Sequence, residues 1–246
     1  MHVEIGKIVK RLPAVTSTNT EAARLIKENR APEGTVILAG YQTHGRGQGK
    51  NQWVSEKGLN LLMSLILKPD FLPAMKQFYL SMSIAAGIQQ YISGLGIPAM
   101  IKWPNDILTR GFKLAGILIE NTVMSSCLAT SVIGIGMNVN QQSFPADLPN
   151  ATSLSLETGK TYDLTETMRN LISHLENSIN LLYERRFSDT RTIYLNHLWK
   201  LNTRSTFTDN TGSHEGKIVD VAETGELVVM KKTGETILYE FKEVVF

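Results

Sequence analysis

The sequence has a single cysteine and no long apolar run. Cys127 has no second cysteine to pair with, so an intramolecular disulfide is excluded, as is typical of a chain that works in a reducing compartment. No segment approaches the ~20 consecutive apolar residues that a membrane-spanning helix needs, and residues 1–15 lack the apolar core of a signal peptide. We therefore expect a cytoplasmic protein without a membrane segment.

Net charge is also small. The chain has 25 lysines and arginines against 23 aspartates and glutamates, a balance that argues against a protein coating nucleic acid with a generally basic surface. Charge blocks, internal repeats and low-complexity tracts are missing, and the five histidines are scattered without the spacing of a zinc site. A composition of 42% hydrophobic and 20% charged residues instead predicts a globular protein with a substantial core.

The hydrophobic pattern predicts a sheet flanked by helices. Residues 35–41 and 59–67 are typical of buried strands, and the polar loop of residues 43–58 joins them. Residues 113–124 and 127–139 are nearly continuous apolar runs, predicted to pair antiparallel at the centre of the sheet. Apolar spacing in three other segments indicates helices at residues 18–26, 84–92 and 168–182, and a further helix is expected through Trp199. These strands and helices together predict an α/β (α+β) fold with a mixed central sheet.

Two regions outside this pattern are predicted separately. Residues 141–160 are polar and contain prolines, so we expect a loop. After Leu201 the pattern changes to short β-like runs, broken by Thr-Gly pairs and without helical periodicity. We therefore predict two domains, residues 1–200 and a small C-terminal β-barrel of residues 201–246.

The segment Lys102-Trp103-Pro104-Asn105-Asp106 places a lysine and a carboxylate around a turn, and Lys113 follows seven residues later. Two lysines near one carboxylate in an otherwise apolar sequence suit the handling of an anion. Each residue also has a structural explanation, since Lys113 follows Arg110-Gly111 as a solvated hairpin residue would and an Asp after Pro-Asn is often a turn former.

The loop Gly45-Arg46-Gly47-Gln48-Gly49-Lys50 carries three glycines and two cations. Glycine permits positive φ angles and leaves backbone N–H groups accessible, so such a loop can wrap around an anionic ligand. The alternative is a flexible connector. Downstream, Gly134-Ile135-Gly136-Met137-Asn138 has glycines that permit close approach of another chain segment to a buried strand.

In this order, these motifs resemble the biotin–protein ligase (biotin–[acetyl-CoA-carboxylase] ligase) family over roughly the first 140 residues. The resemblance implies ATP-dependent ligation of biotin to a lysine of a biotin carboxyl carrier domain through biotinyl-5'-AMP, with ATP and biotin as substrates and Mg²⁺ as the metal. It also implies a class II synthetase-like catalytic domain and an SH3-like C-terminal barrel. Because the match begins within the first twenty residues, we expect a monofunctional ligase that does not bind DNA.

The same resemblance assigns roles to residues of this chain. It implies catalytic roles for Lys113 and Arg46. The implied biotin-binding residues are Ser17, Thr18, Asn19, Gln42, Gly45, Arg46, Lys113 and Gly116; those for ATP are Arg46, Gly47, Gln48, Trp53, Lys102, Asn105 and Asn138; and those for the metal are Asp106 and Asn138.

Some of these residues keep structural alternatives, and one departs from the family. Ser17, Thr18 and Asn19 have the character of helix-capping residues, and Trp53 could anchor the next strand. Many family members have arginines after the second glycine of the loop, whereas this chain has Gln48 and Gly49. We therefore expect this loop to retain the intermediate less firmly.

Two other functions compete with this one. A lipoate or octanoate–protein ligase shares the architecture, but its arginine- and glycine-rich motif is not visible. A non-catalytic biotin or nucleotide sensor is disfavoured by Arg46 and Lys113, because a sensor has no need of catalytic charge. The sequence permits a side-by-side homodimer through the sheet but does not decide whether one forms. The expected protein partner is the biotin carboxyl carrier protein.

Overall fold

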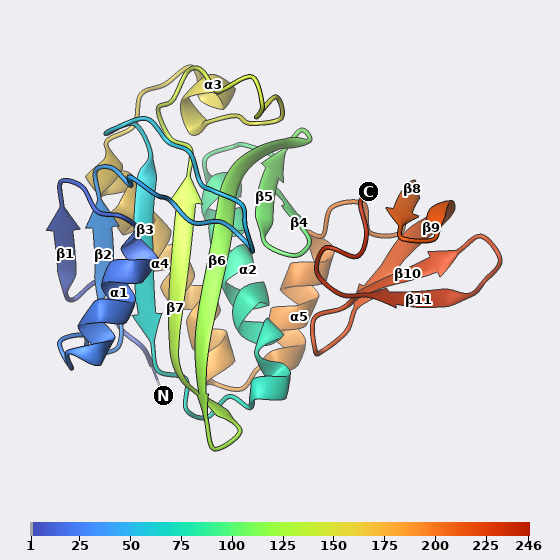
Figure 1. Cartoon of the computed structure of the whole chain (residues 1–246), viewed down its shortest axis with the longest axis horizontal. Helices are drawn as coiled ribbons and strands as arrows, with labels where there is room; N and C mark the ends of the chain where they lie inside the picture. Colours follow the sequence, from blue (N-terminus) through green and yellow to red (C-terminus); the bar gives the residue numbers. More distant parts are fainter. Residues whose placement is uncertain (1) are drawn as a thin grey trace.

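The computed structural model describes residues 2–246, which form two sheets and five α-helices (Figure 1). The larger sheet has seven strands in the order β1-β2-β3-β7-β6-β5-β4. Its strands are β1 (Val9–Leu12), β2 (Val36–Ala39), β3 (Leu61–Leu67), β4 (Met100–Lys102), β5 (Asp106–Thr109), β6 (Phe112–Met124) and β7 (Cys127–Met137). The helices are α1 (Thr18–Lys27), α2 (Phe78–Gly94), α3 (Leu154–Thr158), α4 (Leu164–Tyr183) and α5 (Phe187–Asn196), with a 3₁₀ turn η1 (Ala74–Lys76).

The two long apolar runs form the centre of this sheet. Strands β6 and β7 pair antiparallel from Ala115 opposite Met137 to Met124 opposite Cys127. Strand β3 pairs antiparallel with the other side of β7, whereas β1 and β2 are parallel, so the sheet is mixed. The predicted α/β architecture and its central antiparallel pair are confirmed.

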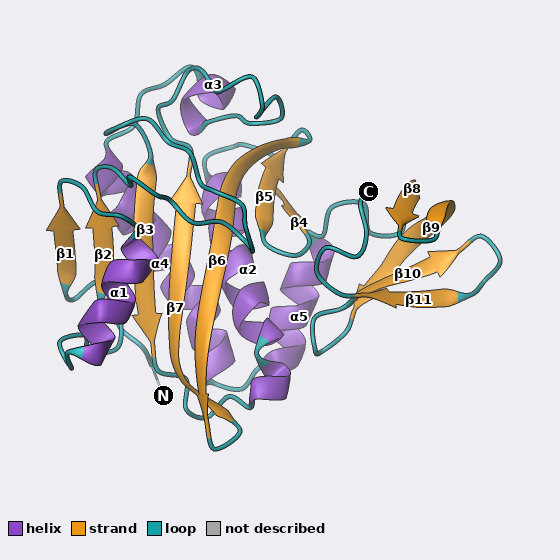
Figure 2. Ribbon diagram, in the orientation of Figure 1, coloured by secondary structure: helices purple, strands orange, loops and turns teal. Residues whose placement is uncertain are grey.

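Helices cover the two faces of the sheet unequally (Figure 2). Helices α2 and α4 pack against each other behind the sheet, and α2 is buried on almost every side, which explains its nearly continuous apolar sequence. Helix α1 lies on the opposite face, where Ala22 and Leu25 pack on Ile37, Ile66 and Val132. This face is covered by one short helix and by loops, which leaves room for a cavity.

Three local features differ from the sequence-based expectations. Helix α3 lies within the segment expected to be a loop; Ser153 caps it by accepting a hydrogen bond from the Leu156 N–H, and Gly159 ends it at φ +70°. Asp106, a suspected turn former, is the first residue of β5. Ser17 occupies the N-cap position of α1, but its side chain forms no capping hydrogen bond.

The C-terminal region is a four-stranded antiparallel sheet in the order β11-β10-β9-β8. Its strands are β8 (Arg204–Asp209), which the sequence pattern did not single out, β9 (Gly212–Val221), β10 (Leu227–Lys231) and β11 (Thr236–Tyr239). This sheet is consistent with the predicted SH3-like module, although its strands pair in an open row and do not close into a barrel within the described residues. The Trp103 indole N–H donates to the Gly225 carbonyl at 2.8 Å and links the module to the larger sheet.

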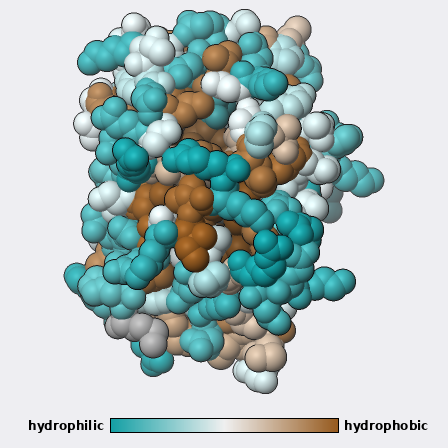
Figure 3. Space-filling model, turned by 90° about the vertical axis from the view of Figure 1, so that its left-hand side faces the viewer, coloured by the Kyte–Doolittle hydropathy of each residue, from teal (hydrophilic) through white to brown (hydrophobic). Residues whose placement is uncertain are grey.

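Seen from the β1 side, apolar side chains gather at the middle of the molecule among hydrophilic ones (Figure 3). In the described chain, residues 2–246, we find no helix with both the length and the apolar character needed to cross a membrane.

Candidate functional site

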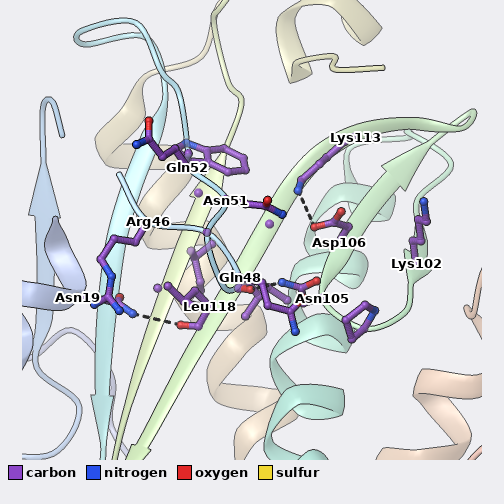
Figure 4. Close-up of a pocket in the computed structure, with 18 of the residues that line it drawn as sticks. Asn19, Arg46, Gln48, Asn51, Gln52, Lys102, Asn105, Asp106, Lys113 and Leu118 are labelled. Carbon is purple, nitrogen blue, oxygen red and sulfur yellow. Dashed lines mark hydrogen bonds and ion pairs between the residues drawn. The ribbon is translucent and has the colours of Figure 1, made fainter. Parts of the chain in front are cut away.

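A cavity of about 300 Å³ opens on the sheet face that carries α1 (Figure 4). Strands β6 and β7 form its floor, the glycine loop of residues 45–53 lies across it, and residues 242–246 of the C-terminal tail form part of its wall. Every predicted site residue except Gly45 and Asn138 lines this cavity. The motifs that are far apart in the sequence therefore meet at one place.

The end of the cavity next to α1 is built from neutral polar groups. Gln42 Oε1 accepts hydrogen bonds from the Thr18 N–H at 2.7 Å and from the Thr18 hydroxyl at 3.1 Å. The Ser64 hydroxyl donates to Asn19 Oδ1 at 2.6 Å and lies 2.7 Å from Thr18 Oγ1. Thr18 and Asn19 thus use their side chains in a buried network at the cavity and not as helix caps, because Ser17 already holds the N-cap position.

Asn19 also reaches the long central strand. Its side-chain amide donates to Glu120 Oε2 at 2.8 Å and to the Leu118 carbonyl at 3.3 Å. Arg46 meets the same carboxylate from the glycine loop, with one guanidinium nitrogen 2.6 Å from Glu120 Oε1 and another 3.1 Å from Oε2. At this end of the cavity the charge of Arg46 is therefore balanced by Glu120.

The glycines of the downstream motif make room for two side chains of the site. A Cβ at Gly134 would lie 2.4 Å from Asn19 Oδ1, and a Cβ at Gly136 would lie 2.4 Å from Cε2 of Trp53. Gly116 pairs with Gly136 across the two strands, and a Cβ there would be 3.0 Å from the same indole. The motif is thus explained by the close approach of Asn19 and Trp53 to the sheet.

Trp53 rests on these glycines with its indole N–H buried and, within residues 2–246, without a hydrogen-bond partner. An unpaired buried donor costs about 1–3 kcal/mol, so this N–H is available to an acceptor on a ligand. Lys113 Nζ lies 5.7 Å from the centre of the Trp53 ring. The indole therefore lies between the neutral end of the cavity and its lysines.

The glycine loop folds as a small hairpin. The Trp53 N–H donates to the Gly45 carbonyl at 2.9 Å and the Gly47 N–H donates to the Asn51 carbonyl at 2.8 Å. Gly45 does not line the cavity, but a Cβ there would be 2.3 Å from the Trp53 carbonyl, so it permits the hairpin to close. Gly49 turns at φ +65° directly against Lys242 Nζ, which brings the C-terminal tail onto the loop.

The far end of the cavity is cationic. Lys113 Nζ lies 2.7 Å from Asp106 Oδ1, and Figure 4 shows the two side chains pointing toward each other. Lys102 Nζ lies 5.4 Å from the Trp199 ring and 5.6 Å from the Phe246 ring. Among the cavity cations of the described chain, Arg46 and Lys113 form ion pairs whereas Lys102 and Lys242 form none, which leaves this end with an excess of positive charge.

A neighbouring lysine adds to this excess. Lys200 Nζ lies 4.2 Å from the Trp199 ring, next to Lys102. Burial, and secondarily the charge of Lys102, lower the pKa of Lys200 below its usual value. Two ammonium groups held near the same aromatic rings favour an anion of high charge at this end.

Asn105 and Asn138 have structural contacts. The Asn105 amide donates to the Ile117 carbonyl at 2.7 Å, and the Ile117 N–H donates back at 2.9 Å, so Asn105 fixes the turn after β4 while lining the cavity. The buried Asn138 amide donates to the Thr152 carbonyl at 2.9 Å, outside the cavity lining. Asn138 thus joins the end of β7 to the segment before α3.

The donor set does not fit a resident metal ion. Asp106 is engaged by Lys113, Asn138 lies outside the cavity lining, and no group of three or more His, Cys, Asp or Glu side chains in residues 2–246 could hold a metal. Mg²⁺ commonly binds through one or two carboxylates together with the phosphates of a nucleotide. The side chains of residues 2–246 at this cavity therefore supply too few free carboxylates to hold Mg²⁺ on their own.

Sequence reasoning missed several residues of the site. Glu120 and Ser64 belong to its hydrogen-bond network, and Asn51, Gln52, Lys242 and residues 244–246 line the cavity. The spacing of the family motifs gives no signal for the C-terminal tail, because its position depends on how the second sheet packs. The isolated charge of Glu120 in an apolar strand was a signal that could have been used.

Fold and site together define a class: an α/β enzyme in which one cavity on the sheet combines a neutral hydrogen-bonding end with a cationic end. The model of the biotin/lipoate A/B protein ligase family matches residues 12–138. The bifunctional ligase/repressor BirA of Bacillus spizizenii is 34% identical over 229 residues, which cover 92% of this chain and 70% of that protein. The biotin–[acetyl-CoA-carboxylase] ligase of Mycobacterium tuberculosis is 32% identical over 142 residues, or 56% of this chain and 51% of that protein.

Among solved structures, the biotin protein ligase of Aquifex aeolicus in complex with biotin and ATP aligns with a TM-score of 0.80 at 26% identity. The alignment covers 97% of this chain and 98% of that structure, so the likeness includes the C-terminal sheet. This chain belongs to the biotin/lipoate A/B protein ligase family.

Proposed function

We propose that this protein is a biotin–protein ligase that uses ATP to join biotin to a lysine of a biotin carboxyl carrier domain. The observation that carries the proposal is the division of one cavity into a neutral polar end and a cationic end that includes Lys113. Biotin has a neutral ureido group at one end and a carboxylate at the other. Its ureido group suits the network of Thr18, Asn19 and Gln42, and its carboxylate then points toward Lys113.

In the first step a biotin carboxylate oxygen attacks the α-phosphorus of ATP. A new P–O bond forms, the bond to the β-phosphate bridge breaks, and pyrophosphate leaves with the electron pair, so biotinyl-AMP is formed. Two anions meet in this step, and the ammonium groups of Lys113 and Lys102 stabilise the negative charge that gathers in the transition state. Trp53 offers its ring and its free N–H to the adenosine part.

In the second step the neutral amine of a carrier lysine attacks the acyl carbon of biotinyl-AMP. The new amide C–N bond replaces the C–O bond to phosphate, AMP leaves, and the amine loses one proton. Water would compete with the amine as a nucleophile, so the glycine loop across the cavity has a direct use in shielding the intermediate.

The cellular setting belongs to the same proposal. One cysteine and the absence of a spanning helix within residues 2–246 suit work in the cytoplasm. Among the described residues 2–246, strand β1 pairs only with β2, so its other edge is open to a second copy of the chain. Sedimentation at several concentrations would show whether a side-by-side homodimer forms there.

The test of the function is ATP–pyrophosphate exchange in the presence of Mg²⁺ with biotin, lipoate or octanoate as the acid. We expect exchange with biotin alone, followed by biotin transfer to a purified carrier domain. Exchange that requires lipoate or octanoate would assign the protein to the other branch of the family. Biotin binding without exchange would indicate a sensor.

A further inference from the structure

We propose that Glu120 is a positioning residue that tethers the glycine loop to the sheet and so controls how long the activated intermediate stays bound. The proposal rests on the proposed ligase function and adds a role for a residue outside the cavity lining. Glu120 does not touch the cavity itself, but two residues that line it, Arg46 and Asn19, both bind its carboxylate.

The tether is the single hydrogen-bonded link between the loop and the sheet. Between Gly45 and Trp53, the hydrogen bonds of the described chain join loop residues to one another, except for the two from Arg46 to Glu120. Apart from this pair, the loop meets the sheet through the packing of Trp53 on its glycines. Loss of the pair would therefore free the loop without changing its own hairpin.

The carboxylate is held in place from the other side. Asn19 donates to Glu120 Oε2 through its amide nitrogen, while its Oδ1 accepts from the buried Ser64 hydroxyl. This arrangement fixes which way the Asn19 amide faces, and Gly134 makes it sterically feasible. A carboxylate oriented by a buried amide can accept two hydrogen bonds from one guanidinium, so Asn19 sets the geometry in which Glu120 meets Arg46.

The distribution of charge in the site indicates that the Arg46–Glu120 pair has a structural role. Arg46 lies at the neutral end of the cavity and is balanced by Glu120, whereas Lys102 has no acidic partner within residues 2–246. The ion pair with Glu120 therefore holds Arg46, and with it the glycine loop, against the sheet. Because both side chains are partly exposed, with 49% and 37% of their surfaces accessible, the pair is a weak link that can open for ligand entry and exit.

The test compares Glu120→Gln, Arg46→Gln and the double variant. Glu120→Gln retains the side-chain shape but removes the charge that holds Arg46. We expect biotinyl-AMP to be released from Glu120→Gln about fivefold faster than from the wild type, as the loss of one exposed ion pair predicts. The release rate should change more than the single-turnover rate of adenylate formation, because Glu120 does not touch the reacting groups.

Glu28→Gln is the matched control, since Glu28 pairs with Arg24 on α1 away from the cavity. It should release biotinyl-AMP at the wild-type rate, and thermal unfolding should verify that all variants fold. In the double variant, release should be no faster than in Arg46→Gln alone, because the two residues act as one contact. Wild-type release from Glu120→Gln, or additive effects in the double variant, would overturn the proposal.

A second measurement separates this inference from the ligase function. Proteinase K should cut within residues 43–58 of the ligand-free Glu120→Gln protein about fivefold faster than in the wild type. If the wild type makes no biotinyl-AMP, the proposed function fails while this measurement still tests the tether. Equal cleavage of the two proteins would reject the tether whatever the function is.

Discussion

Lys113 Nζ lies 2.7 Å from Asp106 Oδ1, so this lysine of the cationic end of the cavity is oriented by a carboxylate on the neighbouring strand. The contact exists because β5 and β6 pair antiparallel with an irregularity between Ile107 and Leu108, which places Asp106 beside Gly116 and brings Lys113 back toward it. Asp106 therefore aims the ammonium group that would meet the two reacting anions.

This relationship predicts the effect of Asp106→Asn. The amide is similar in shape but lacks the charge that holds Lys113, and a small displacement of a catalytic group can cost on the order of 10–10²-fold in rate. We expect biotin-dependent exchange to fall by that amount, with a change in unfolding free energy below about 1 kcal/mol, because the pair is partly exposed. Asp189→Asn removes an exposed partner of Arg186 and serves as the control. An exchange rate equal to that of the wild type would show that Lys113 needs no orienting partner.

The packing of Trp53 on the sheet predicts the effect of Gly136→Ala. The new Cβ would lie 2.4 Å from the indole, so the ring must move away from the floor of the cavity. We expect the KM for ATP to rise roughly tenfold, since an aromatic stacking contact contributes about 1–3 kcal/mol per base, together with a changed tryptophan fluorescence spectrum. Gly94→Ala is the matched control, because its Cβ would meet nothing closer than 3.9 Å. If Gly136→Ala bound ATP normally, Trp53 would have no part in the nucleotide site.

A buried hydroxyl away from the site predicts a change in stability. Tyr194 on α5 is fully buried beside Phe78, and its OH has no hydrogen-bond partner within residues 2–246. Burial also raises the pKa of Tyr194 far above its usual value, so the hydroxyl stays protonated. Because an unpaired buried polar group costs about 1–3 kcal/mol, Tyr194→Phe should leave the free energy of unfolding unchanged or raise it by about 1 kcal/mol. Chemical denaturation measures this, and a loss of more than about 1 kcal/mol would reveal a partner for the hydroxyl.

The sequence predicted the parts of the fold that depend on local pattern. The long apolar runs of β6 and β7 and the apolar spacing of α4 each identify an element from its own residues. Helix α3 was missed because five residues are too few to show a helical period. Strand β5 was missed because Pro104-Asn105 indicates a turn, and the strand begins at the next residue.

Site residues that belong to a sequence motif were predicted to be site residues. Those that join the site only through contacts between distant parts of the chain were missed. Lys113 and Asp106 lie close in the sequence, so one motif was enough to predict both as site residues. Arg46 and Glu120 are 74 residues apart, and no local pattern links a loop arginine to a glutamate in the middle of a strand. The entry of residues 242–246 into the cavity wall depends on the docking of the C-terminal sheet, which local sequence does not encode.

We propose that Lys113 carries the catalytic charge and that biotin is recognised at the other end of the cavity. The most direct test of this proposal is Lys113→Ala, measured for both biotin-dependent ATP–pyrophosphate exchange and equilibrium binding of biotin. We predict that exchange falls on the order of 10²–10³-fold, as for the loss of a preorganised charge donor, while the Kd for biotin changes less than about tenfold, because the polar network of Thr18, Asn19 and Gln42 remains. Exchange that persists at the wild-type rate in Lys113→Ala would contradict the account.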